Sequence, residues 1–231
     1  MKVENLGCKA EIEVKNNLQK KQIELNGLKA KIIVKVKDEN EKVVKVKEFP
    51  ANSFLLNFMK MLYTVFIVGS IKAKDTKGNE VDMKMVRIKE SKTYTVEFRT
   101  ITRSYEQAGY HAWALKQDDS HGILIGTGTE SVSVDDYTLS SKIPNGLEKG
   151  KMLYLESVIS DVIVSGNSAY VKLTRSFLNY SGDTITINEV GLAVRQFSPK
   201  TDILIIRDLI EPIEVPNNYG VDVSYVIEVH V

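Results

Sequence analysis

Apolar and polar residues alternate along most of the chain, and this alternation predicts strands. Residues 9–15 (KAEIEVK) carry apolar side chains at every second position, a period typical of a half-buried strand. LKAKIIVKVK and VVKVKEF show the same period on either side of the acidic turn DENEK, which predicts a β-hairpin. A second hairpin is predicted for 65–74 and 81–89 around DTKGN, and a further strand for 93–105.

One segment has a helical period instead. After Pro50, apolar residues recur at three- and four-residue spacing between Phe54 and Phe66, which predicts one amphipathic helix over about 52–66. A single helix beside so many strands has to bury its wide apolar face, so we expect it to pack on a sheet. A ligand groove along the helix is the sharper alternative.

From Gly122 onward the pattern is β throughout. Its most regular stretch, Tyr170 to Leu192, predicts a hairpin of two strands joined by a Ser-Gly-Asp turn. Frequent strands separated by turn residues favour a mainly β fold, an antiparallel β-sandwich or a jelly-roll-like barrel. We expect a single β-rich domain over 1–231. The alternative is a basic hairpin-helix-hairpin part at 1–116 and an acidic β-sandwich part at 117–231.

Charge is unevenly distributed although the formal net charge is only +1. Residues 1–116 hold 23 Lys and Arg against 14 Asp and Glu, whereas residues 117–231 hold 8 against 16. Halves of opposite sign suit head-to-tail contact between copies, or docking of the basic half on an acidic surface. Two solvated faces without a partner are the alternative. The lysines alternate with apolar residues and form no dense basic block, which argues against direct nucleic-acid binding.

The N-terminal half also indicates the cellular compartment in which the protein is made. A lone cysteine, Cys8, excludes an internal disulfide framework and a cysteine-only zinc site. The first residues lack the apolar core of a signal peptide, and the longest apolar run is interrupted by Asn57 and Lys60. We therefore expect synthesis in the cytoplasm and no membrane association.

Three short motifs suggest chemistry, and each has a simpler interpretation. Gly126-Thr127-Gly128 resembles a dinucleotide loop but lacks the third glycine and precedes an extended segment. His121 follows Asp118-Asp119-Ser120, a cluster that suits a metal or a proton relay but is simply explained as a polar loop before a strand. Asp135-Asp136 suits a calcium ion or a side-chain-capped turn. We predict no catalytic residue, no cofactor and no metal.

Polar residues inside apolar strands are more informative. Glu189 needs a partner if it is buried, and Arg175, Arg195 and Arg207 on neighbouring predicted strands are candidates. We predict a structural ion pair that fixes strand register, because a lone glutamate without a paired acid, base or nucleophile does not make an active site. The predicted structural site residues are Arg175, Asn188, Glu189, Arg207 and Asp208.

The second half resembles a recurrent domain in structural proteins of tailed bacteriophages and related archaeal viruses. The pattern is a glycine-threonine turn with paired aspartates, an aromatic strand ending Asn-x-Ser-Gly, an Asn-Glu-Val-Gly-Leu strand and a closing Arg-Asp strand. The first half adds Ser53-Phe-Leu-Leu-Asn-Phe before a Leu-Tyr pair. The matching residues of the second half are Gly126, Thr127, Gly128, Asp135, Asp136, Arg175, Phe177, Asn179, Ser181, Gly182, Asn188, Glu189, Gly191, Leu192, Arg207 and Asp208.

This resemblance implies a non-enzymatic protein of the virion, made in the host cytoplasm. Its first implication is a capsid-surface or decoration subunit that forms homo-oligomers and contacts other capsid or tail proteins. A tail-tube, neck or fibre-attachment component is the alternative. A carbohydrate-binding adhesin module is a further alternative from another class, and Trp113 with Tyr105 and Tyr110 is the aromatic cluster that would serve it.

Overall fold

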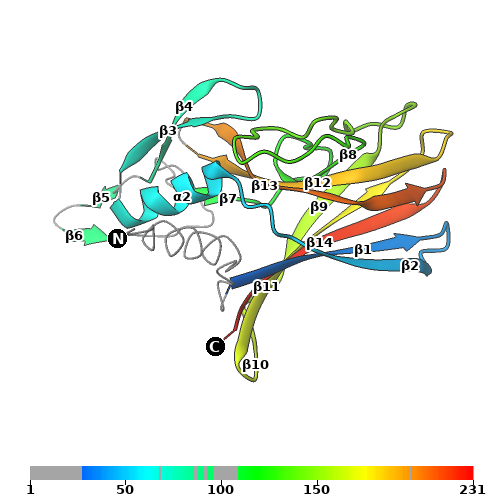
Figure 1. The fold of residues 1–231 in the computed structure, drawn as a ribbon, viewed down its shortest axis with the longest axis horizontal. Helices are drawn as coiled ribbons and strands as arrows, with labels where there is room; N and C mark the ends of the chain where they lie inside the picture. Colours follow the sequence, from blue (N-terminus) through cyan, green and yellow to red (C-terminus); the bar gives the residue numbers. More distant parts are fainter. Residues whose placement is uncertain are drawn as a thin grey trace, which may run out of the picture.

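The computed structural model describes residues 28–67, 69–85, 88–90, 93–95, 109–197 and 199–230. These residues form mainly antiparallel strands arranged in two larger sheets, with one helix at one end (Figure 1). Apolar side chains from both sheets meet in one buried core. The predicted mainly β, sandwich-like fold is therefore confirmed.

The first sheet, called sheet A, has six strands, and every neighbouring pair is antiparallel. Alternate residues of one strand, Ile32, Val34 and Val36, are buried against the core, while Ile33 and Lys35 between them lie on the outer face. The strands in spatial order are β10 (Ile163–Ser165), β11 (Ser168–Leu178), β14 (Gly220–His230), β1 (Leu28–Lys37) and β2 (Val43–Pro50), with β9 (Leu153–Ile159) also paired with β11.

The second sheet, called sheet B, is centred on β12 (Ile185–Gln196). β12 pairs with β13 (Thr201–Val215) on one side, and with β7 (Tyr110–His111) and β8 (Gly122–Gly126) on the other. β8 and most of β13 are buried, as expected for apolar runs in the middle of a sandwich. Residues 127–152 cross this part of the molecule as a long loop between β8 and β9.

The two strands of the regular stretch Tyr170 to Leu192 do not form the predicted hairpin. β11 belongs to sheet A and β12 to sheet B, so the chain crosses between the layers at the Ser-Gly-Asp turn. Asn179 explains the crossing, because its buried amide donates to the carbonyls of Asp183 and Val215 and its side-chain oxygen accepts from Ser181. The bonds with Asp183 and Ser181 shape the turn itself, and the bond to Val215 holds it against the end of β13.

The hairpin β1–β2 is confirmed, with the turn at the predicted acidic residues. The second hairpin forms around the DTKGN turn but is shorter than predicted, with strands β3 (Ser70–Lys74) and β4 (Glu80–Lys84). β5 (Ile88–Glu90) and β6 (Thr93–Thr95) make a small separate pair. The strand predicted at 9–15 and the rest of that predicted at 93–105 lie outside the described residues.

The helix α2 (Leu56–Ile67) begins four residues later than predicted. The preceding residues instead run beside β13, where Phe54 forms an isolated bridge with Ile206. The face that α2 buries is partly polar: Asn57 donates to the carbonyls of Lys74 and Leu204, and Thr64 bonds to the Tyr110 hydroxyl.

The predicted burial of the whole apolar stripe of this helix is wrong. Phe58 and Met61 pack against the core, but Met59, Tyr63 and Phe66 are exposed, Phe66 to 81%. The reason is the position of α2, which contacts β3, β4 and one end of β13 instead of lying across the middle of a sheet (Figure 1).

Candidate functional site

The carboxylate of Glu189 is fully buried between β12 and the long loop that follows β8. Its Oε1 accepts from the amides of Gly128 at 3.2 Å and Ser141 at 2.7 Å. Its Oε2 accepts from the Ser140 amide at 3.1 Å and from Nε of Arg207 at 2.9 Å. Three amides and one guanidinium therefore stabilise the charge that burial would otherwise penalise.

Arg207 extends this network to the far side of the loop. It is 2% exposed, and its remaining nitrogens donate to Asp136 Oδ2 at 2.6 Å and to the carbonyl of Glu130 at 2.9 Å. Asp136 also accepts the Ser133 amide at 2.9 Å, so Asp136 caps a turn that is held by an arginine. The pair Glu189–Arg207 therefore anchors residues 128–141 to sheet B.

The glycines of the Gly126-Thr127-Gly128 turn have a steric explanation in this network. A Cβ on Gly126 would lie 2.4 Å from Glu189 Oε1, and one on Gly128 would lie 1.8 Å from Ser140 Oγ. Both positions are therefore restricted to glycine by the approach of the carboxylate. The turn holds a protein carboxylate where a dinucleotide loop would hold a phosphate.

Arg175 is not a partner of Glu189. It lies in β11 at 0% exposure, and its guanidinium donates only to backbone carbonyls. The guanidinium lies over the aromatic ring of Tyr154, with the guanidinium carbon 4.8 Å from the ring centroid. Burial lowers the pKa of Arg175. The acceptors are the carbonyls of Leu115, Asp118, His121, Ile123 and Leu155.

The two remaining predicted residues, Asn188 and Asp208, fix different segments of the chain. The Asn188 amide donates to the carbonyl of Thr127 at 2.8 Å. Asp208 Oδ1 accepts the amides of Asn52 and Ser53, which fixes the segment before α2. Burial raises the pKa of Asp208 and, more strongly, that of Tyr225 beside it. The structure thus brings Glu189, Arg207 and Asn188 together and places Arg175 and Asp208 in separate networks.

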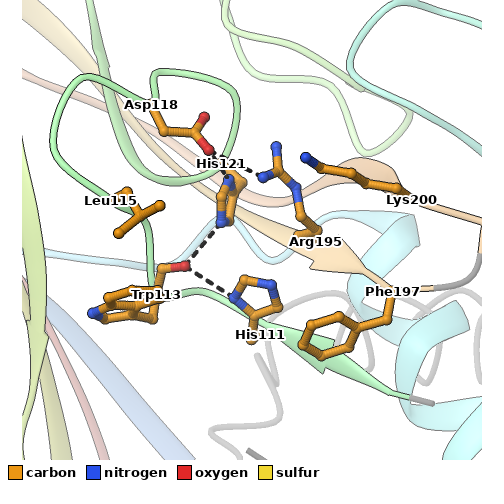
Figure 2. Close-up of a pocket in the computed structure, with 8 residues that line it drawn as sticks. All are labelled: His111, Trp113, Leu115, Asp118, His121, Arg195, Phe197 and Lys200. Carbon is orange, nitrogen blue, oxygen red and sulfur yellow. Dashed lines mark hydrogen bonds and ion pairs between the residues drawn. The ribbon is translucent and has the colours of Figure 1, made fainter. Parts of the chain in front are cut away.

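A second polar cluster lines a pocket of about 390 Å³ at the end of sheet B (Figure 2). Arg195 donates to both oxygens of Asp202, at 2.7 and 3.1 Å, and to Asp118 Oδ2 at 3.0 Å. Its other contact is the Ser120 hydroxyl, which in turn donates to Asp118. The arginine is therefore neutralised by two carboxylates. The pocket residues are His111, Trp113, Leu115, Asp118, His121, Arg195, Phe197 and Lys200.

The histidines of this pocket share one acceptor. His111 Nδ1 and His121 Nε2 lie 2.9 and 2.8 Å from the carbonyl oxygen of Trp113 (Figure 2). A carbonyl only accepts hydrogen bonds, so each ring carries its proton on the nitrogen that faces it. His121 then presents an unprotonated Nδ1 to Asp118 Oδ2, 3.5 Å away.

Burial and the charge of Arg195 make His121 a weak base. Burial is the largest cause and Arg195 the next, and together they lower the pKa of His121 to about 4. Burial lowers the pKa of His111 as well. Burial would raise the pKa of Asp118, but hydrogen bonds from Ser120 and the charges of His121 and Arg195 lower it to about 2. At neutral pH the two rings are neutral and Asp118 is ionised.

The aromatic cluster proposed for glycan binding is only partly assembled here. Trp113 lines the pocket, but Tyr110 is half-buried and its hydroxyl bonds to Thr64 at 2.9 Å. Tyr105 lies outside the described residues. The pocket can offer Trp113 and the stacked rings of His111 and Phe197 to a small polar ligand.

The described part of the chain shows neither a metal-binding cluster nor a membrane-spanning helix. Within it, no group of three or more His, Cys, Asp or Glu side chains could hold a metal ion. None of the described helices has the length and apolar character needed to cross a membrane.

Sequence reasoning missed the ion pairs Arg207–Asp136, Arg195–Asp202 and Arg195–Asp118. Asp118 and Asp136 were visible in the pairs Asp118-Asp119 and Asp135-Asp136, whereas Asp202 stands singly at the start of a strand. Nothing local indicated which arginine each would meet. Comparison with protein-family models, with curated proteins and with solved structures finds no match for this chain.

Proposed function

We propose that this protein is a non-enzymatic structural component of a virion, a capsid-surface or decoration subunit that assembles through protein–protein contacts. The observation that carries the proposal is the position of the exposed apolar side chains on the surface. Most of them lie in runs on both outer edges of sheet A and along α2, whereas Leu115 is the one that lines the pocket among the described residues. Such surfaces on a folded domain are typical of contact sites.

The residues on which the resemblance to phage and archaeal-virus proteins rests are compatible with the same interpretation. Gly126, Gly128, Glu189, Arg207 and Asp136 form one buried network, and the network's contacts are all used in holding a loop. Because the side chains of this network all bond to one another or to the loop, the network suits a structural scaffold better than a catalytic site.

The decisive experiment is electron microscopy of virions with antibody labelling of this protein. Label on the shell supports a decoration subunit, and label on the tail or neck supports the tail-tube, neck or fibre-attachment alternative. Preparations that carry no label, although the infected cells contain the protein, would contradict both.

A carbohydrate-binding adhesin is the second candidate, favoured by the pocket at Trp113. Its aromatic wall and its Asp118–Arg195 edge suit the apolar face and the hydroxyl groups of a sugar ring. A glycan array probed with the wild type and with Trp113→Ala tests it. Binding that Trp113→Ala abolishes supports this candidate, and an array without hits counts against it.

A further inference from the structure

We propose that copies of this protein join edge to edge through sheet A, with β2 of one copy lying parallel to the 158–165 edge of the next. This inference rests on the proposed function, since it names the contact by which the subunit would assemble. It goes beyond that function by assigning the two surfaces and the direction of the strands.

The first surface is β2, the last strand on one side of sheet A. Residues 43–48 are exposed although they form regular strand, and among the described strands β2 pairs only with β1. Val43, Val44 and Val46 are 42%, 51% and 52% exposed. An open edge with several exposed valines is a template for another strand.

The second surface lies on the opposite side of the sheet. β9 and β10 follow one another along β11, and both are antiparallel to it. The outer edge of residues 154–157 is already occupied, because Ser157 donates to the carbonyl of Ala114 and Gln117 donates to that of Tyr154. The open part therefore starts at Val158. Its apolar residues Val158, Ile159, Val162, Ile163 and Val164 are 39% to 73% exposed.

The charges on these two edges are complementary. Lys45 lies on β2, and Asp161 lies within the open part of the other edge. Among the described residues, neither of the two is in an ion pair. Two β2 edges would bring lysines together and two 158–165 edges would bring acids together, whereas the mixed contact pairs opposite charges. A second copy of the chain offers an edge with exposed valines and a charge of opposite sign, so we infer that it is the partner of each edge.

The topology determines the strand direction. β2, β14 and the β9–β10 edge run the same way, because each is separated from the next by one antiparallel strand. A rotation that repeats sheet A head to tail therefore places β2 and the 158–165 edge in parallel. Such a heterologous contact repeats from copy to copy and makes a ring or a filament.

Cross-linking of mixed single-cysteine variants of the full chain tests this contact. Val44→Cys and Val162→Cys, each in a Cys8→Ser background, are treated with a short bis-maleimide separately and as an equimolar mixture. We expect dimers in the mixture, at least about fivefold above either variant alone. Lys149→Cys, whose side chain is 85% exposed in a loop, is the control and should not cross-link with Val44→Cys.

Charge reversal provides the second arm. Lys45→Glu should weaken association about fivefold in sedimentation experiments, and Asp161→Lys added to it should restore the wild-type value. Cross-linking of Val44→Cys with itself as strong as in the mixture would show β2–β2 pairing and overturn the proposal. Oligomers that form without cross-links in the mixture overturn this contact and leave the virion proposal standing. A protein that stays monomeric also overturns it, and virion labelling then judges the function independently.

Discussion

Nε of Arg207 donates to Oε2 of Glu189 at 2.9 Å, with the two side chains 2% and 0% exposed. Glu189→Gln would put an amide group among three backbone N–H donors and leave Arg207 with Asp136 as its single charged partner. We expect the free energy of unfolding to fall by about 3–5 kcal/mol, as for other broken buried ion pairs. Urea denaturation measures it.

The matched control for that variant is Glu211→Gln. Glu211 pairs with Lys47 at 3.0 Å, but its side chain is 70% exposed, so the loss should stay below about 1 kcal/mol. Equal losses for the two variants would contradict a special role for the buried pair. Limited proteolysis should also show cleavage within 128–141 in Glu189→Gln only.

Gly128→Ala should be strongly destabilising for a steric reason. The new Cβ would lie 1.8 Å from Ser140 Oγ and 2.5 Å from Glu189 Oε1. We expect a loss of about 3 kcal/mol, in the range of overpacked sites. Gly150→Ala is the comparison, because its φ of +75° disfavours alanine but nothing lies within 4 Å of the new Cβ. It should cost only about 1–2 kcal/mol, and thermal melting ranks the two variants.

Arg175→Lys should loosen the segment that the guanidinium holds. A single ammonium group cannot reach carbonyls on both the 115–123 segment and Leu155, so some of these acceptors lose their donor. We expect a loss of at least about 2 kcal/mol, with faster hydrogen exchange in residues 115–123. Lys172→Met, on the same strand but on the outer face, should change stability by less than about 0.5 kcal/mol. Unchanged exchange in Arg175→Lys would contradict the anchoring role.

Alternation was sufficient to predict the strands because it reflects burial on one face, a property of each segment alone. It placed the β1–β2 hairpin correctly, whereas the strand at Gly122 was predicted from a continuous apolar run. It failed at Tyr170 to Leu192, where both strands are real but pair with others. The partners of β11 and β12 and the bond from Asn179 to Val215 are contacts between distant parts of the chain, and such contacts leave no local pattern.

The ion pair of Glu189 was predictable in part, because burial is indicated locally whereas the choice of partner is not. Glu189 was recognisable as an acid that needs a partner, since it lies in an apolar strand. Which arginine would supply the partner depended on sheet order: Arg207 lies next to it on β13, whereas Arg175 lies in the other layer. The prediction for the helix was wrong for a different reason. An apolar period predicts which face of a helix is apolar, but it does not show whether another element covers that face.

His121 should make stability depend on pH between about 6.5 and 4. Its folded-state pKa of about 4 lies below the unfolded value, so the unfolded chain binds the additional proton in this range. Stability is therefore complete above pH 6.5 and falls as the pH drops toward 4. We expect about 2 kcal/mol less at pH 5 than at pH 7 from this residue. His121→Gln keeps an N–H donor for the Trp113 carbonyl and should remove most of this difference in denaturation experiments at the two pH values. A variant that loses as much stability as the wild type would show that another group is responsible.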